Sequence, residues 1–274
     1  MDIYQETTKF YQSFQGEKAV IGKSLCGRNI YAVKIGVGAP TGIAQYALHG
    51  REFITAKLAF LHAKMGLNKG SFWIIPLANP DGALLSQIGL SAISSEKRKK
   101  RLLALNGGNK DFSLWKANAR GVDLNVNFPA KWGMGVKNTK TPGTENYIGQ
   151  KPLSEPETKA LQSFTEKINP DYTVSYHTKG EEIYWYFYQT EQTAARDKRM
   201  AQALSAATGY PLKTAHGSAG GYKDWCIQER KIPSFTVEAG SDLLQHPIGE
   251  NGLENILRKN QNALTALAAA FENG

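Results

Sequence analysis

Four polar side chains of types that bind metal ions or move protons follow closely on apolar, strand-like runs: His49, Glu52, His177 and Glu238. Each is weak evidence alone, because H-x-x-E is a common pattern and a lone histidine at a strand end is usually an ordinary hydrogen-bonded residue. Two histidines and one carboxylate that meet at one point, however, form a zinc site with a fourth position open to water. The pattern predicts such a site and leaves open which carboxylate is the ligand. His62 belongs to no such pattern and is interpreted as a helix-face residue.

The segments around these residues alternate between strand-like and helix-like patterns. Apolar runs predict strands at 30–35, 45–48, 71–78, 172–176, 183–188 and 234–237, and helical spacing predicts helices at 52–66, 154–168, 193–208 and 253–272. Strands separated by crossover helices imply a mixed, largely parallel twisted sheet with helices on both faces, an α/β fold. Ligands of such sheets bind at the carboxyl ends of the strands, where the polar residues fall.

Domain organisation is simple. We find no internal repeat, no low-complexity linker and no boundary, so residues 1–274 are predicted to form a single domain. The run 79–82, Asn-Pro-Asp-Gly, predicts a turn. The segment 133–149 is the one long stretch without periodicity, which is typical of a functional loop over a site.

Composition excludes several classes of protein. The chain has 274 residues, of which 41% are hydrophobic and 21% charged, as in ordinary soluble domains. No run approaches the ~18 apolar residues of a membrane span, so we expect no membrane-spanning segment. Two distant cysteines, Cys26 and Cys226, form neither a disulfide framework nor a zinc ribbon. The N-terminus lacks an apolar signal-like core, so a cytoplasmic location is the simplest expectation, with an extracellular or cell-wall location left open.

The formal net charge of +9 favours anionic partners. Its densest run, residues 96–101, precedes an apolar stretch and contains no aromatic residue. This pattern is more typical of a solvated helix than of a nucleic-acid site. We therefore expect no nucleic-acid partner.

Six short motifs occur in an order that resembles the zinc carboxypeptidase family: H-G-R-E, N-P-D-G, A-N-A-R-G-V-D-L-N, S-E-P-E, S-Y-H-T and T-V-E-A-G. The match in order and spacing runs from residue 22 to about residue 252. The block 176–180, together with 183–185, is similar to the bacterial branch that includes γ-D-glutamyl-diaminopimelate peptidases. The resemblance implies a zinc carboxypeptidase-like fold.

The resemblance also implies a role for each residue at the predicted zinc site. His49, Glu52 and His177 match the ligands of one Zn²⁺ per chain. Glu238 matches the general base and proton shuttle. Asp123 matches an acid that orients the first histidine ligand.

Substrate-binding residues follow from the same comparison. Arg120 matches an arginine that stabilises the oxyanion, and Asn125 matches half of an Asn-Arg pair that holds the terminal carboxylate. Val126 stands where that pair has its arginine, so the carboxylate clamp is incomplete. His216 falls at or near the position of a mobile tyrosine, whereas Tyr222 lies close by without matching it.

Together these features favour a zinc peptidase or amidase that acts on cell-wall muropeptides, at or near the γ-D-Glu–diaminopimelate bond. Lys179 or Lys223 is the expected cation in place of the missing arginine. The alternatives are a carboxypeptidase acting on ordinary peptides and a catalytically inactive module that binds cell-wall peptides. The sequence leaves open the oligomeric state, the choice between endo and exo cleavage, and the stereochemistry of the bond.

Overall fold

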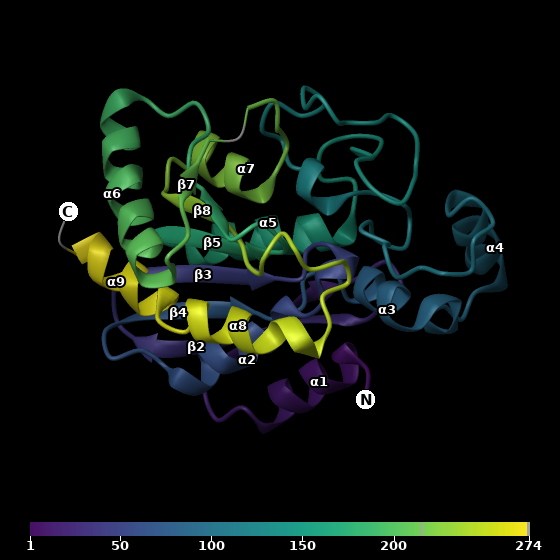
Figure 1. The fold of residues 1–274 in the computed structure, drawn as a ribbon, viewed down its shortest axis with the longest axis horizontal. Coiled ribbons are helices and arrows are strands. Elements are labelled where there is room, and N and C mark those ends of the chain that lie inside the picture. Colours follow the sequence, from purple (N-terminus) through teal and green to yellow (C-terminus); the bar gives the residue numbers. More distant parts are fainter. Residues whose placement is uncertain (215, 273–274) are drawn as a thin grey trace.

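A twisted sheet of eight strands forms the centre of the molecule, in a computed structural model that describes residues 1–214 and 216–272 (Figure 1). The strands are β1 (Lys18–Lys23), β2 (Asn29–Val37), β3 (Thr41–Tyr46), β4 (Gly70–Ile75), β5 (Tyr172–His177), β6 (Glu182–Tyr184), β7 (Leu212–Lys213) and β8 (Ser234–Glu238). Their order across the sheet is β1-β2-β4-β3-β5-β8-β6-β7.

The middle of the sheet is parallel and its flanks are mixed. β4, β3, β5 and β8 run in the same direction. β2 is antiparallel to both β1 and β4, and β6 is antiparallel to β8 but parallel to β7. The carboxyl ends of β3, β5 and β8 therefore meet at one edge of the sheet. This confirms the expected single α/β domain with a mixed, largely parallel sheet.

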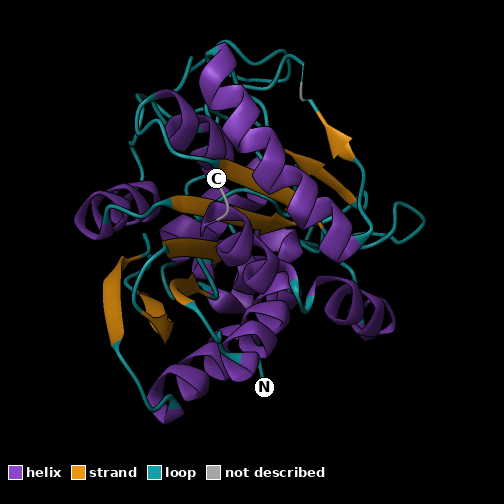
Figure 2. Cartoon of the chain, turned by 90° about the vertical axis from the view of Figure 1, so that its left-hand side faces the viewer, coloured by secondary structure: helices purple, strands orange, loops and turns teal. Residues whose placement is uncertain are grey.

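Helices cover both faces of the sheet (Figure 2). The long helices are α1 (Ile3–Ser13), α2 (Thr55–Met65), α3 (Pro80–Ile88), α4 (Glu96–Leu105), α5 (Pro156–Ile168), α6 (Glu191–Thr208), α8 (Glu250–Asn260) and α9 (Ala263–Glu272), with a shorter α7 (Tyr222–Gln228). The helices α2, α6, α8 and α9 share one core cluster with the sheet, and α5 and α7 share the other. The basic run forms α4, a solvated helix at the periphery in Figure 1.

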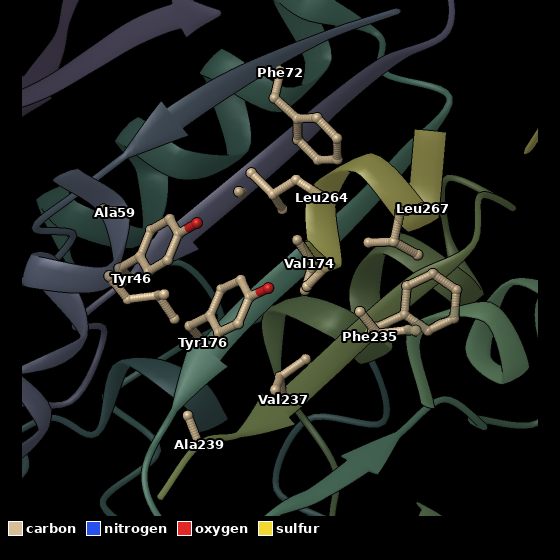
Figure 3. Packing of buried hydrophobic residues seen from close by; sticks show 14 of the residues in the cluster. Tyr46, Ala59, Phe72, Val174, Tyr176, Phe235, Val237, Ala239, Leu264 and Leu267 are labelled. Carbon is tan, nitrogen blue, oxygen red and sulfur yellow. The ribbon is translucent and has the colours of Figure 1, made fainter. Parts of the chain in front are cut away.

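Alternation along the buried strands builds the two cores. Tyr46 and Tyr176 stack in the first core with ring centroids 4.8 Å apart, and Figure 3 shows both beside Val174 and Val237. Ile43, on the opposite face of β3, packs in the second core. Burying both faces of a strand explains why these segments are apolar runs rather than alternating patterns.

Several predicted boundaries were wrong, each for a local reason. β3 ends at Tyr46 because Ala47 adopts a left-handed φ of 50°, and β4 ends at Ile75 because Pro76 has no N–H for the ladder. β6 stops at Tyr184, and Tyr188 already has a φ of 51°.

Helical segments also differ from the prediction. The expected turn at 79–82 opens α3, because the Asn79 side chain accepts from Gly82 N and caps the helix. The C-terminal segment is two helices rather than one, and the predicted helix at 52–66 starts at Thr55 after a short 3₁₀ turn, η1 (Gly50–Glu52). None of the described helices is both long and apolar enough to cross a membrane.

Candidate active site

The predicted metal ligands converge at the carboxyl edge of the sheet. Glu52 Oε1 lies 2.8 Å from His49 Nδ1, and Glu52 Oε2 lies 2.8 Å from His177 Nδ1. The two Nδ1 atoms are 3.0 Å apart, and one ligand atom from each residue falls within 4.8 Å of the others. All three side chains are buried. Two imidazole nitrogens and a carboxylate oxygen that face one point fit the donor set of a catalytic zinc ion.

Local backbone geometry delivers these ligands. The left-handed Ala47 turns the chain out of β3 toward His49, and η1 then places Glu52 one turn later on the same side. His177 is the last residue of β5, the strand next to β3. The three ligands thus come from two adjacent strand ends.

Asp123 lies directly behind the first histidine. Its Oδ1 is 3.2 Å from His49 Nε2, and its Oδ2 is 2.8 Å from Lys116 Nζ and accepts from Asn146 N at 3.1 Å. A carboxylate on the second ring nitrogen fixes the imidazole so that Nδ1 faces the metal position. This geometry is the one expected for Asp123.

Electrostatics keep the buried carboxylates charged. Burial raises the pKa of Glu52, but His49 and His177 beside it bring the pKa well below its usual range. Asp123 behaves in the same way, because Lys116 and His49 outweigh its burial and lower its pKa. Both groups are therefore anions near neutral pH, as metal ligation and histidine orientation require.

Glu238 has the opposite character. It ends β8 as the register partner of His177, and burial raises its pKa to about 7 against the opposing effect of His177. A carboxylate with a pKa near the working pH can both accept and return a proton.

A cavity of about 480 Å³ opens beside these residues. Its lining includes His49, Lys116 and Glu238, together with Lys223 and Asp224 of α7. The loop 133–149 contributes Val136, Lys137, Asn138 and Asn146 to the wall. The aperiodic segment is therefore a loop over the site, held to the loop before α7 by a hydrogen bond from Val136 N to Gly217 O of 2.8 Å.

The structure does not bring Arg120 to this cavity. Its guanidinium Nε lies 3.5 Å from Glu155 Oε2 and its side chain is 40% exposed. Asn118 Oδ1 accepts from Arg120 N and Val122 N and so fixes the turn on which Arg120 lies. Arg120 is not among the residues that line the cavity, so this geometry does not support the oxyanion role expected of it, and that role stays a prediction.

Lys116 is the cation that the prediction missed. It lines the cavity, and its carbonyl accepts from Gly50 N at 2.9 Å, next to His49. Burial lowers its pKa, but Asp123 raises it, and the net shift is upward. Lys116 therefore stays protonated. The available signal was a basic residue four positions before Arg120, next to the motif A-N-A-R-G-V-D-L-N.

Two of the three residues expected to bind substrate, Asn125 and His216, line the cavity. Asn125 and Val126 line it, and Asn125 Oδ1 accepts from Tyr222 N at 3.2 Å. His216 also lines the cavity, with Nε2 3.3 Å from Thr214 Oγ1. Tyr222 is fully buried against Thr165, away from the cavity.

The two candidate cations differ in position. Lys223 lines the cavity, whereas Lys179 binds the Asp242 carbonyl at 2.6 Å and is not among the lining residues. His62 is a structural residue, since its two ring nitrogens meet Tyr46 Oη at 2.6 Å and the Asn260 carbonyl at 2.8 Å.

This set of ligands on this sheet edge defines a zinc metallopeptidase site. Comparison with known proteins agrees: the family model described as zinc carboxypeptidase matches residues 4–255. The chain belongs to the zinc carboxypeptidase family, and His49, Glu52 and His177 are its zinc site.

Two curated bacterial proteins are similar in sequence. Gamma-D-glutamyl-L-diamino acid endopeptidase 1 of Lysinibacillus sphaericus is 36% identical over 250 residues, which cover 84% of this chain and 62% of that protein. Murein peptide amidase A of Escherichia coli K12 is 33% identical over 141 residues, 48% of this chain and 54% of that protein. The chain thus spans less than two thirds of the length of these relatives.

A solved structure has the same fold. Bovine thrombin-activatable fibrinolysis inhibitor, in complex with a tick carboxypeptidase inhibitor, superposes with a TM-score of 0.79 at 18% identity. The alignment covers 100% of this chain and 98% of that chain. At this identity the likeness concerns the fold alone.

Proposed function

We propose that this chain hydrolyses an amide bond of bacterial cell-wall peptides, between γ-D-glutamate and the diamino acid that follows it. The proposal rests on one observation: the zinc ligands lie beside a cavity in which the carboxylate clamp is incomplete. Val126 lines that cavity where the family has the arginine of its Asn-Arg pair. The similarity to a γ-D-glutamyl-L-diamino acid endopeptidase supports the choice of bond. The net charge of +9 suits an anionic muropeptide.

His49, Glu52 and His177 would hold the metal, with Asp123 fixing the His49 ring. Zinc in this position supplies Lewis-acid activation of water and of the scissile carbonyl.

Glu238 moves the proton in this scheme. Its carboxylate takes a proton from the attacking water and returns it to the leaving amine, which a pKa of about 7 permits near neutral pH. Its place at the end of β8, in register with His177, puts the base next to the metal ligands.

Lys116 supplies positive charge for the oxyanion. Its ammonium lines the cavity beside His49 and is held by Asp123 at 2.8 Å. Three donors on one ammonium leave capacity for the developing negative oxygen after the bond to Asp123 is made. The task expected of Arg120 is therefore assigned to Lys116.

The incomplete clamp argues for a substrate without an ordinary C-terminal residue. Val126 offers no donor at the cavity wall, and Asn125 Oδ1 is already engaged by Tyr222 N. Only the Asn125 amide nitrogen remains for a substrate oxygen, an ordinary hydrogen bond of about 1 kcal/mol.

Mass spectrometry of muropeptide digests tests the proposal, with the zinc-loaded enzyme compared with and without a chelator. We expect chelator-sensitive products that end in D-glutamate and begin with the diamino acid. Release of single C-terminal residues would indicate an ordinary carboxypeptidase. Binding of muropeptides without cleavage would indicate an inactive binding module.

A further inference from the structure

A buried ion pair lines the active-site cavity apart from the zinc ligands. Lys223 and Asp224 occupy the first turn of α7, and both are cavity-lining residues although only 6% and 3% exposed. Lys223 Nζ lies 2.6 Å from Asp224 Oδ1. Two charges that are held out of water on the wall of a substrate cavity act on a charged ligand with little screening, so the pair suits a ligand that carries both charges.

The pair has unused hydrogen-bonding capacity. Lys223 Nζ donates to Asp224 Oδ1 and, at 3.2 Å, to the Tyr186 carbonyl, which uses two of its three protons. Asp224 Oδ2 accepts from Gly221 N at 3.0 Å. A carboxylate has about four acceptor sites, so each partner retains capacity for a bound molecule.

The fold holds the pair in place. Asp224 caps the N-terminus of α7 through Gly221, and the Lys223 ammonium lies 5.3 Å from the centroid of the Phe187 ring. Ion pairs that are already oriented bind charged ligands without a large ordering cost. Thr236, another residue that lines the cavity, adds a polar side chain to its lining.

We infer that Lys223 and Asp224 bind the side-chain terminus of diaminopimelate, a group that carries both a carboxylate and an ammonium. The inference rests on the proposed function and deepens it. Lys223 pairs with the carboxylate and Asp224 with the ammonium. Lysine, the other common diamino acid of cell-wall peptides, has the ammonium alone and leaves the last Lys223 donor unmatched.

The other lysines near the site are poorer candidates for this task. Lys179 is engaged by Asp242 and is not among the cavity-lining residues. Lys137 lines the cavity but is exposed, so water screens its charge. Lys223 is the buried one, and a charged hydrogen bond contributes most where water is excluded.

Two peptides that differ by one carboxylate test the inference: γ-D-Glu–meso-diaminopimelate and γ-D-Glu–L-Lys in the same sequence. With zinc-loaded wild-type enzyme, we expect kcat/KM to favour the diaminopimelate peptide by about 10- to 100-fold. Lys223→Met should lower turnover of that peptide by a similar factor and leave the lysine peptide nearly unchanged.

Two further variants control for misfolding and for the loss of a lysine elsewhere. Lys223→Met combined with Asp224→Asn leaves no unpaired buried charge, so it preserves the readout if the single variant fails to fold. Lys179→Met is the matched control, because it removes a lysine paired with an aspartate outside the cavity, and we expect it to leave the ratio unchanged. Binding of both peptides to zinc-loaded Glu238→Gln should give the same preference without turnover.

Each outcome is decisive. The inference would be overturned if wild-type enzyme cleaved the two peptides equally and Glu238→Gln bound them equally. The proposed function would then still stand. A preference that survives Lys223→Met, or that disappears in Lys137→Met instead, would also overturn it. Cleavage of neither peptide would refute the proposed function, and the inference with it.

Discussion

His177 and Glu238 are register partners at the ends of the neighbouring parallel strands β5 and β8. One is a zinc ligand with a neighbouring carboxylate at 2.8 Å, and the other is a partly buried acid whose pKa desolvation raises to about 7. The ladder that pairs them fixes the distance between the metal position and the proposed base without any loop. Strand pairing therefore sets the geometry of the reaction centre.

Glu238→Gln should separate catalysis from metal binding. The amide keeps the shape of the side chain but cannot accept the proton of water, so we expect kcat to fall by at least ~10²–10⁴-fold. Zinc content, measured by atomic absorption, should remain at one equivalent. His177→Ala is the contrasting control, which should lose zinc and activity together. Activity within about tenfold of the wild type would mean that another group is the base.

Lys116 and Arg120 can be separated by paired substitutions. Lys116→Met removes the cavity cation, and we expect kcat to fall by about 10²-fold, as for loss of an oxyanion donor. Arg120→Met should leave kcat within a few-fold, because its guanidinium pairs with Glu155 outside the cavity. Steady-state kinetics on a muropeptide would measure both. A larger loss of kcat in Arg120→Met than in Lys116→Met would show that Arg120 stabilises the oxyanion.

Val126→Arg should move substrate preference toward ordinary C-termini. An arginine beside Asn125 could form a charge-assisted contact with a free carboxylate, worth roughly 1.5–3 kcal/mol. We therefore expect the ratio of kcat/KM for blocked dipeptides to that for muropeptides to rise by about tenfold or more. Efficient cleavage of blocked dipeptides by the wild type, unchanged in the variant, would argue against the substrate proposed above.

Stability should depend on His62 in acid. Burial lowers its pKa from 6.5 to about 4 in the folded protein, so the unfolded chain binds more protons between these values. The free energy of unfolding should accordingly fall as the pH decreases from about 6.5 to about 4, by on the order of 3 kcal/mol from this residue.

Urea unfolding across that pH range measures the His62 effect. His62→Gln cannot titrate but can replace both hydrogen bonds, to Tyr46 Oη and the Asn260 carbonyl. Its curve should be flatter than that of the wild type over the same window. Parallel curves for the two proteins would show that another group causes the acid sensitivity.

The position of polar residues at the ends of apolar strands predicted a zinc site, and the resemblance to the zinc carboxypeptidase family supplied His49, Glu52 and His177 as its ligands. His177 and Glu238 each follow a continuous apolar run, and the fold brings such ends to one edge. The strands β1 and β7 and the helices α1 and α7 were not predicted from the sequence. β7 is two residues long and α7 only seven, too short for a clear period.

Lys116 was harder to predict, because it lies in an irregular loop without helix or strand periodicity. There, side-chain hydrogen bonds such as those of Asn118 decide which residue faces the site. Neither hydrophobic periodicity nor motif order reports these bonds, so the sequence did not indicate Lys116. The cytoplasmic location and the absence of a nucleic-acid partner remain predictions.

Digestion of a muropeptide in water enriched in heavy oxygen tests the central claim most directly. If the zinc-loaded chain hydrolyses the γ-D-Glu–diaminopimelate bond, mass spectrometry should find one heavy oxygen in the fragment that ends in D-glutamate. The fragment that begins with diaminopimelate should carry none, and a chelator should abolish both products. Label at a different peptide carboxylate, or products that persist without metal, would contradict the account.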